Sequence, residues 1–198
     1  MKVLKALTLS LSLALASLAS APAQAAQEVA GVKFEDWYNF NGQQLQLSGA
    51  GLRKMMIMKV YVVGLYVPRK EASVQALVNT PGAKSIQVVL LRDVDAHRLT
   101  DALVMGVEDN STASEWAAIK NRVADMSKAM RGFGDVREGT VVKLEYVPNQ
   151  GTTVSQNGRP VIRDIPGEDF FRGLMKIWLG EHPADKTLKA SLLGASAD

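Results

Sequence analysis

Arg53 and Tyr61 are the two side chains whose types and spacing could do chemistry together. They belong to residues 53–67, RKMMIMKVYVVGLYV, which are apolar almost throughout and rich in β-branched and aromatic types. If this run is one strand, Arg53, Lys59 and Tyr61 share a face, because side chains alternate between the two faces of a strand. A guanidinium binds a carboxylate through two parallel hydrogen bonds, and a phenol adds one neutral donor. The pattern is typical of a site for a carboxylate or an oxyanion.

The same charges have a second interpretation. Arg53 and Lys59 could lie at the edge of a sheet and extend their charged ends to water. His97, at the start of an expected helix, could line the mouth of a cleft or lie in a solvated first turn. The methionines of the run suit an adaptable apolar pocket, although ordinary core packing would use them equally well.

Composition excludes several classes of function. The chain has 198 residues, no cysteine and two histidines without metal-ligand spacing, so we expect no thiol chemistry, no metal site and no cofactor. The sequence contains no glycine-rich phosphate loop and no nucleophile motif, and we predict no catalytic residue. The net charge of +3 includes Lys2 and Lys5; the remainder has 21 basic and 20 acidic residues, so no nucleic-acid partner is expected.

Residues 1–25 are predicted to be a cleaved secretory signal peptide. Two lysines precede an uncharged apolar run of 14 residues, which is shorter than the roughly 20 residues that a membrane-spanning helix needs. Ala23-Gln24-Ala25 matches the small-x-small pattern before a signal-peptidase cut. We therefore expect a periplasmic or secreted protein without a stable membrane anchor, in which residues 26–198 form one domain.

The hydrophobic pattern of those residues indicates an α+β fold. Strands are expected at 29–34, 44–47, 53–67, 85–91, 140–147, 152–155 and 159–165, with a break at 48–51. Helices are expected at 72–78, 95–108, 113–130, between Gly167 and Gly180, and at 184–193. Thr112 and Glu115 have capping-box spacing, and Asn157-Gly158 is a hairpin-turn dipeptide. Because strands and helices are grouped rather than alternating, the sheet should be antiparallel.

Two well-separated motifs resemble the chalcone isomerase-like family. The first is GAGLR at 49–53 followed by KVYVVGLY at 59–66, and the second is IPGEDFF at 165–171 running into IWLG at 177–180. The resemblance covers nearly all of the chain after residue 25. It implies an open-faced β-sandwich, with a large antiparallel sheet packed against a layer of helices and a ligand cleft between them. The family is known for enzymes that cyclise chalcones, for non-catalytic relatives that bind fatty acids, and for exported bacterial members.

The resemblance also assigns roles to single residues. Arg53 falls on the family's cleft arginine, which holds an oxyanion in the enzymes and a carboxylate in the binders. At position 61 this chain has a tyrosine, in which it is similar to the fatty-acid-binding branch, whereas plant isomerases have a threonine there. The catalytic tyrosine of those isomerases should lie within 93–99, where this chain has none. Their asparagine has no secure counterpart, and their late serine or threonine falls at about Phe171.

We therefore expect an exported, non-catalytic binding protein for a fatty acid or similar apolar carboxylate. Its expected ligand-binding residues are Arg53, Tyr61, Lys59 and His97. Two alternatives stay open: an intramolecular lyase of the chalcone isomerase type, and an envelope scaffold or partner-binding domain in which Arg53 pairs with a carboxylate of its own chain. The sequence names no protein partner.

Overall fold

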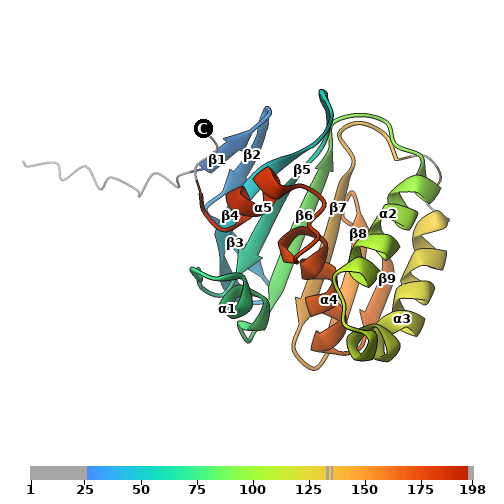
Figure 1. The fold of residues 1–198 in the computed structure, drawn as a ribbon. Helices are drawn as coiled ribbons and strands as arrows, with labels where there is room; N and C mark the ends of the chain where they lie inside the picture. The colour runs from blue at the N-terminus through green and yellow to red at the C-terminus, as the bar shows by residue number, and fades with distance from the viewer. Residues whose placement is uncertain (1–25, 133, 135, 196–198) are drawn as a thin grey trace, which may run out of the picture.

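Seven strands form one antiparallel sheet in the computed structural model, which describes residues 26–132, 134 and 136–195 (Figure 1). The strands lie side by side in chain order: β3 (Trp37–Phe40), β4 (Gln43–Met55), β5 (Met58–Val67), β6 (Lys84–Leu90), β7 (Val141–Val147), β8 (Gly151–Gln156) and β9 (Arg159–Ile165). Two further strands, β1 (Ala26–Val29) and β2 (Val32–Glu35), pair with each other in a separate hairpin.

Helices cover one face of this sheet. They are α1 (Val74–Asn79), α2 (Ala96–Asp109), α3 (Ala113–Arg131), α4 (Glu168–Leu179) and α5 (Lys186–Leu192). Helix α4 lies over the middle of the sheet in Figure 1 and buries eight of its twelve residues. Together these elements form the larger core, which we call the helix-side cluster. Among the residues that the structure describes, no helix is both long and apolar enough to span a bilayer.

The β1–β2 hairpin packs on the opposite face of the sheet. Side chains of β5 alternate between the two faces, so they belong to two different cores. Val63 and Leu65 lie in the helix-side cluster, whereas Val62 and Tyr66 lie in a second cluster beneath β1 and β2. The ring of Phe34 lies directly over Gly64, where any side chain would overlap it. The predicted α+β architecture, a large antiparallel sheet with a layer of helices, is therefore confirmed.

Several local predictions are confirmed as well. The strand at residues 85–91 and the helices that follow it are present, with Asp95 as the N-cap of α2. Thr112 and Glu115 form the complete capping box of α3. Asn157 and Gly158 both have positive φ, 49° and 78°, as the tight turn between β8 and β9 requires.

The prediction of one long strand over residues 53–67 is wrong. The chain reverses at Met56 and Ile57, so β4 and β5 form a hairpin in which Met55 pairs with Met58. Met56 adopts φ 54°, a left-handed conformation that non-glycine residues rarely take. This turn contains no Gly, Asn, Asp or Pro, so the usual sequence signals of a turn are missing.

Other strand boundaries also differ from expectation. Residues 48–51 are not a break but the middle of β4. The single strand expected at 29–34 is divided between β1 and β2 by a turn at Ala30 and Gly31, both with positive φ. Strand β3 was not predicted. The expected signal peptide, residues 1–25, lies outside the described residues.

Candidate functional site

Arg53 and Tyr61 face each other across the β4–β5 hairpin. Their Cα atoms are direct partners in the ladder, and directly opposite side chains of an antiparallel pair point to the same face. That face is the helix side, because Tyr61 packs against the helix-side cluster. The predicted neighbourhood of the two residues is thus correct, although cross-strand pairing and not alternation along one strand produces it.

The Tyr61 hydroxyl is arranged as a neutral hydrogen-bond donor. The indole Nε1 of Trp178, on the buried side of α4, donates to its oxygen at 3.1 Å. That bond occupies an acceptor lone pair and leaves the hydroxyl proton free for another group. Burial raises the pKa of Tyr61, and the hydrogen bond from Trp178 and the nearby Arg53 only partly oppose this. The phenol therefore keeps its proton at neutral pH.

Arg53 is half-buried beside the N-terminus of α5. Its Nη1 lies 3.8 Å from Oδ2 of Asp185, and its side chain keeps 25% of its accessible surface. The same nitrogen donates to the backbone carbonyl of Lys54. The Arg53–Asp185 ion pair is long, and the Arg53 side chain is not fully withdrawn from solvent.

Asp185 also accepts hydrogen bonds from backbone groups of two elements. Its Oδ1 accepts hydrogen bonds from the backbone N–H groups of Thr187 and Leu188, 2.8 and 3.0 Å away, and so caps α5. Its Oδ2 accepts from the backbone N–H of Lys54 at 3.3 Å. The carboxylate fixes α5 to the end of β4 and neutralises part of the Arg53 charge.

Two glycines of β4 bring α5 this close. A Cβ on Gly49 would overlap the carbonyl oxygen of Ser191, and one on Gly51 would lie 2.8 Å from the side chains of Leu188 and Ser191. The helix backbone therefore rests on the strand backbone at Gly49, and side chains of α5 rest on it at Gly51. The GAGLR motif thus has a physical reason, since its glycines seat α5 and its arginine meets the cap of that helix.

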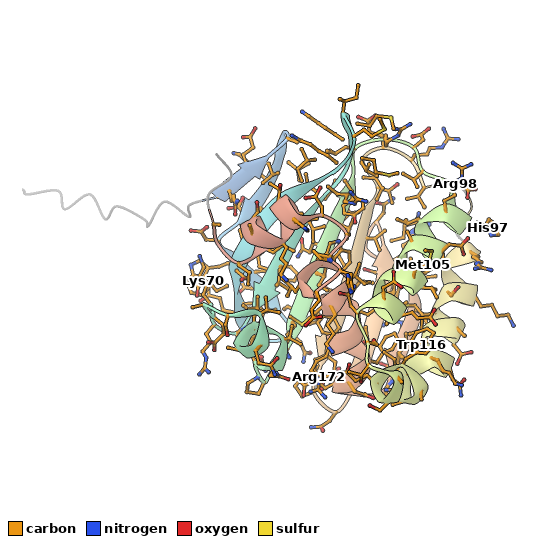
Figure 2. All side chains as sticks on the ribbon, viewed as in Figure 1. Lys70, His97, Arg98, Met105, Trp116 and Arg172 are labelled. Atoms are coloured by element: carbon orange, nitrogen blue, oxygen red, sulfur yellow. The ribbon has the colours of Figure 1, made fainter. Side chains whose placement is uncertain are left out.

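Lys59 and His97 do not join this cluster. Lys59 lies nearer the hairpin turn, exposed and opposite Lys54 in the ladder. His97 is exposed in the first turn of α2, at the outer edge of the molecule beside Arg98 (Figure 2). Of the four residues expected to bind ligand, the structure brings together only Arg53 and Tyr61. Trp178 and Asp185, which the sequence reasoning missed, complete the cluster.

A second buried charge also escaped the sequence reasoning. The Lys84 side chain is fully buried, with its Nζ 2.9 Å from Oε1 of Glu168 and 5.3 Å from the centre of the Tyr146 ring. Burial lowers the pKa of Lys84, and Glu168 offsets part of that shift. At the first position of a strand, a lysine usually reaches solvent, and the sequence offered no sign of this pairing.

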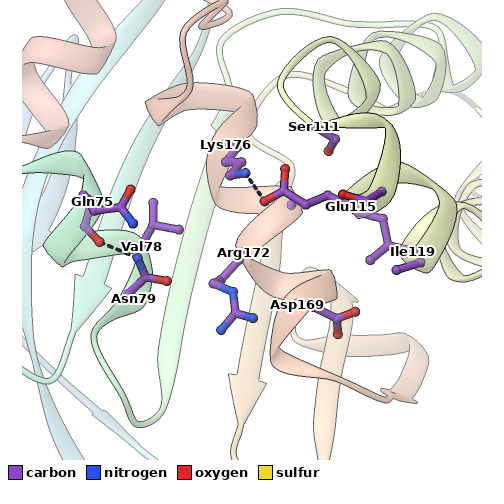
Figure 3. Close-up of a pocket in the computed structure, with 12 residues that line it drawn as sticks. Gln75, Val78, Asn79, Ser111, Glu115, Ile119, Asp169, Arg172 and Lys176 are labelled. Atoms are coloured by element: carbon purple, nitrogen blue, oxygen red, sulfur yellow. Dashed lines mark hydrogen bonds and ion pairs between the residues drawn. The ribbon is translucent and has the colours of Figure 1, made fainter.

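Two cavities lie away from Arg53. One of about 370 Å³ lies between α1, α3 and α4, where the ion pair between Lys176 and Glu115 closes to 2.6 Å (Figure 3). The other, about 390 Å³, adjoins β3, β7, β8 and β9 and includes Lys143 and Glu145 in its walls. Polar and apolar side chains are mixed in the walls of both, so neither is a continuous apolar channel. Within the described part of the chain, no group of three His, Asp or Glu residues could hold a metal ion.

The fold and the cluster define a class: a curved antiparallel sheet that carries a cationic and a phenolic side chain beneath a layer of helices. The model of the chalcone isomerase-like family matches residues 26–194. The chain belongs to the chalcone isomerase-like family. Among solved structures, a fatty-acid binding protein of Arabidopsis thaliana is similar, with a TM-score of 0.63 and 15% identity over 82% of this chain and 92% of the plant chain. A search of curated proteins found no match.

Proposed function

We propose that this chain is a non-catalytic binding protein for a fatty acid or a similar apolar carboxylate. The observation that carries the proposal is the direct pairing of Arg53 and Tyr61 on the helix side of the sheet. The guanidinium supplies the charge, and the Tyr61 hydroxyl supplies one neutral hydrogen-bond donor. The oxygen of that hydroxyl already accepts a hydrogen bond from Trp178. The fatty-acid binding activity of the similar plant protein supports the same ligand class.

Ligand entry requires Arg53 to leave Asp185. A partly exposed ion pair of this length is worth about 0–1 kcal/mol, whereas a carboxylate gripped by both Arg53 and Tyr61 gains charge-assisted hydrogen bonds of about 1.5–3 kcal/mol each. Neither of the two cavities adjoins Arg53. The acyl chain would therefore enter by displacing the short helix α5 from the glycines of β4.

Lipid retained by the exported protein tests the proposal. Export is itself part of it: the protein recovered from the periplasm should have the mass of a chain that begins at Ala26. We expect a fatty acid to co-purify, and Arg53→Ala to retain at least about tenfold less because it loses the charge-assisted contacts. Arg131→Ala, which removes an exposed arginine paired with Asp101, is the matched control. Equal retention by R53A and wild type would refute the proposed role of Arg53.

The Arg53–Asp185 pair supports a second candidate, an envelope scaffold or partner-binding domain in which this arginine has a structural role only. Asp185→Asn separates the two, because asparagine still caps α5 but carries no charge. A binding site should keep or gain retention in D185N, since a competing anion is removed. A purely structural pair should give no retained lipid in any variant and the same loss of stability in R53A and D185N.

A further inference from the structure

The turn between β4 and β5 carries the most exposed apolar side chains of the described residues. Met56 and Ile57 are 94% and 95% exposed, and Met55 and Met58 beside them are about half exposed. These four residues, 55–58, form what we call the apolar tip. It projects beyond the sheet at the top of Figure 1, away from the helix layer. The methionines expected to line a pocket or pack in the core are therefore on the surface.

The backbone of the tip limits how deeply it can enter hydrocarbon. The β4–β5 ladder continues to the Met55–Met58 pair, but β4 pairs with β3 only over residues 43–46 and β5 pairs with β6 only over residues 61–66. The outer backbone groups of the tip therefore have no neighbouring strand, and such groups are costly in hydrocarbon. The side chains of Met56 and Ile57 can enter at the level of the interface while these backbone groups stay hydrated.

Cationic side chains surround the base of the tip. Lys54 and Lys59 are exposed and opposite each other in the ladder, one pair below the tip. Arg92, also exposed, places its Nη1 2.8 Å from the sulfur of Met58. Within the described chain none of the three forms a salt bridge, and Asp185, which accepts from the backbone N–H of Lys54, is engaged with Arg53 and with the cap of α5. We call these three residues the basic collar.

We propose that the apolar tip inserts reversibly into the surface of a bilayer rich in anionic lipid, with the basic collar on the lipid phosphates. Apolar side chains at the end of a projection, ringed by long cationic side chains, match the layered chemistry of that surface, with hydrocarbon below and phosphate above. Lysine and arginine stems can extend from the insertion level to the head groups. Two side chains at a turn give weak docking, not a permanent anchor.

Two features of the surface argue against a protein partner. The apolar tip comprises four residues at a narrow turn, whereas a stable protein interface buries about 800 Å² on each side. A second copy would bring two basic collars together, which like-charge repulsion opposes. The docking proposal does not depend on the fatty-acid proposal, because it concerns a different set of residues.

Vesicle flotation tests the docking. The chain is used without residues 1–25, which are apolar enough to bind vesicles themselves; every described helix and strand lies after them. We expect residues 26–198 to float with vesicles of equal parts phosphatidylglycerol and phosphatidylcholine, and not with phosphatidylcholine alone. Met56→Ser with Ile57→Ser should weaken binding at least about tenfold, and Lys54→Gln with Lys59→Gln about fivefold for each lysine.

Matched controls change the same residue types elsewhere. Met105→Ser removes an exposed methionine of α2, and Lys70→Gln with Lys120→Gln removes two exposed lysines; both variants should bind like the wild type. Failure of the wild type to float with anionic vesicles would overturn the proposal. So would undiminished binding by the M56S/I57S variant, or concentration-dependent dimers that this variant abolishes.

A site-specific probe locates the inserted segment. The chain contains no cysteine, so Ile57→Cys provides a single labelling site. A polarity-sensitive dye at position 57 should shift to shorter wavelength on anionic vesicles, while the same dye on Met105→Cys should not. Equal shifts at both positions would show general adsorption and contradict insertion of the tip. Because this assay contains no fatty acid, its result is independent of the Arg53 experiment.

Discussion

Lys84 brings a positive charge into the helix-side core, where a charge must be paired or it strongly disfavours folding. Its partner Glu168 stands in the first turn of α4, so the pair joins the start of β6 to the helix that carries Trp178. Removing only the carboxylate leaves the buried ammonium uncompensated. Replacing the ammonium with an apolar side chain removes the burial penalty together with the attraction.

These two changes should therefore differ in size. We expect Glu168→Gln to lower the free energy of unfolding by about 1.5–3 kcal/mol, and Lys84→Met to leave it within about 1 kcal/mol of the wild type near neutral pH. Denaturant unfolding measures both, with Glu108→Gln, an exposed carboxylate of α2, as the control. Equal losses for K84M and E168Q would contradict this account.

The same pair predicts a dependence on pH. Burial lowers the pKa of Lys84, so in the pH window between its folded pKa and its higher unfolded pKa the unfolded chain binds more protons. The wild type should therefore gain stability relative to K84M as pH rises through this window, because its burial penalty is released. The titration of other groups cancels in the difference between the unfolding free energies of the wild type and K84M. If this difference did not change with pH, folding would not lower the pKa of Lys84.

At the scale of elements, the seat of α5 on β4 decides where Arg53 lies. We expect Gly49→Ala to lower the free energy of unfolding by about 1–3 kcal/mol, because the added methyl overlaps the helix backbone at Ser191. Because ligand entry is proposed to displace α5 from this glycine, lipid retention by G49A should stay the same or rise. Gly132→Ala is the control, since its Cβ would meet only the Ala129 carbonyl, 3.2 Å away, at a right-handed φ of −73°. If G49A retained wild-type stability, the contact between helix and strand would not be as close as described.

Sequence patterns predicted the elements whose boundaries carry chemical signals. The α3 capping box and the Asn157-Gly158 turn are local, and a local signal does not depend on packing elsewhere. The β4–β5 turn was missed because its residues are apolar and Met56 takes a positive φ. The glycines at 48–51 were misinterpreted as a break, since their purpose, room for α5, comes from a contact with a segment distant in sequence.

The candidate site shows the same division. Arg53 and Tyr61 could be predicted because both lie on one short stretch of chain, and the ladder pairs them even though the predicted strand was wrong. Trp178 and Asp185 could not, because only the folded arrangement of α4 and α5 over the sheet brings them to the same place. A site assembled from segments more than a hundred residues apart leaves no spacing pattern in the sequence.

At the scale of the whole molecule, the proposed binding site and the proposed docking tip share one hairpin. Arg53 lies two residues before Met55, and Tyr61 lies three residues after Met58. Insertion of the tip would hold the Arg53–Tyr61 pair close to the lipid head groups, the level at which the carboxylate of a bilayer fatty acid lies. An acid could then pass from bilayer to protein without crossing bulk water.

This arrangement predicts transfer by collision. With a fluorescent fatty acid loaded in anionic vesicles, the rate of uptake should rise with vesicle concentration, because docking and not escape of the acid into water limits it. The M56S/I57S variant should take up the acid more slowly, while its affinity for acid dissolved without vesicles stays unchanged, since both side chains are almost fully exposed. M105S should behave as the wild type. Uptake by M56S/I57S at the wild-type rate would separate the two functions and leave the tip without a part in ligand transfer.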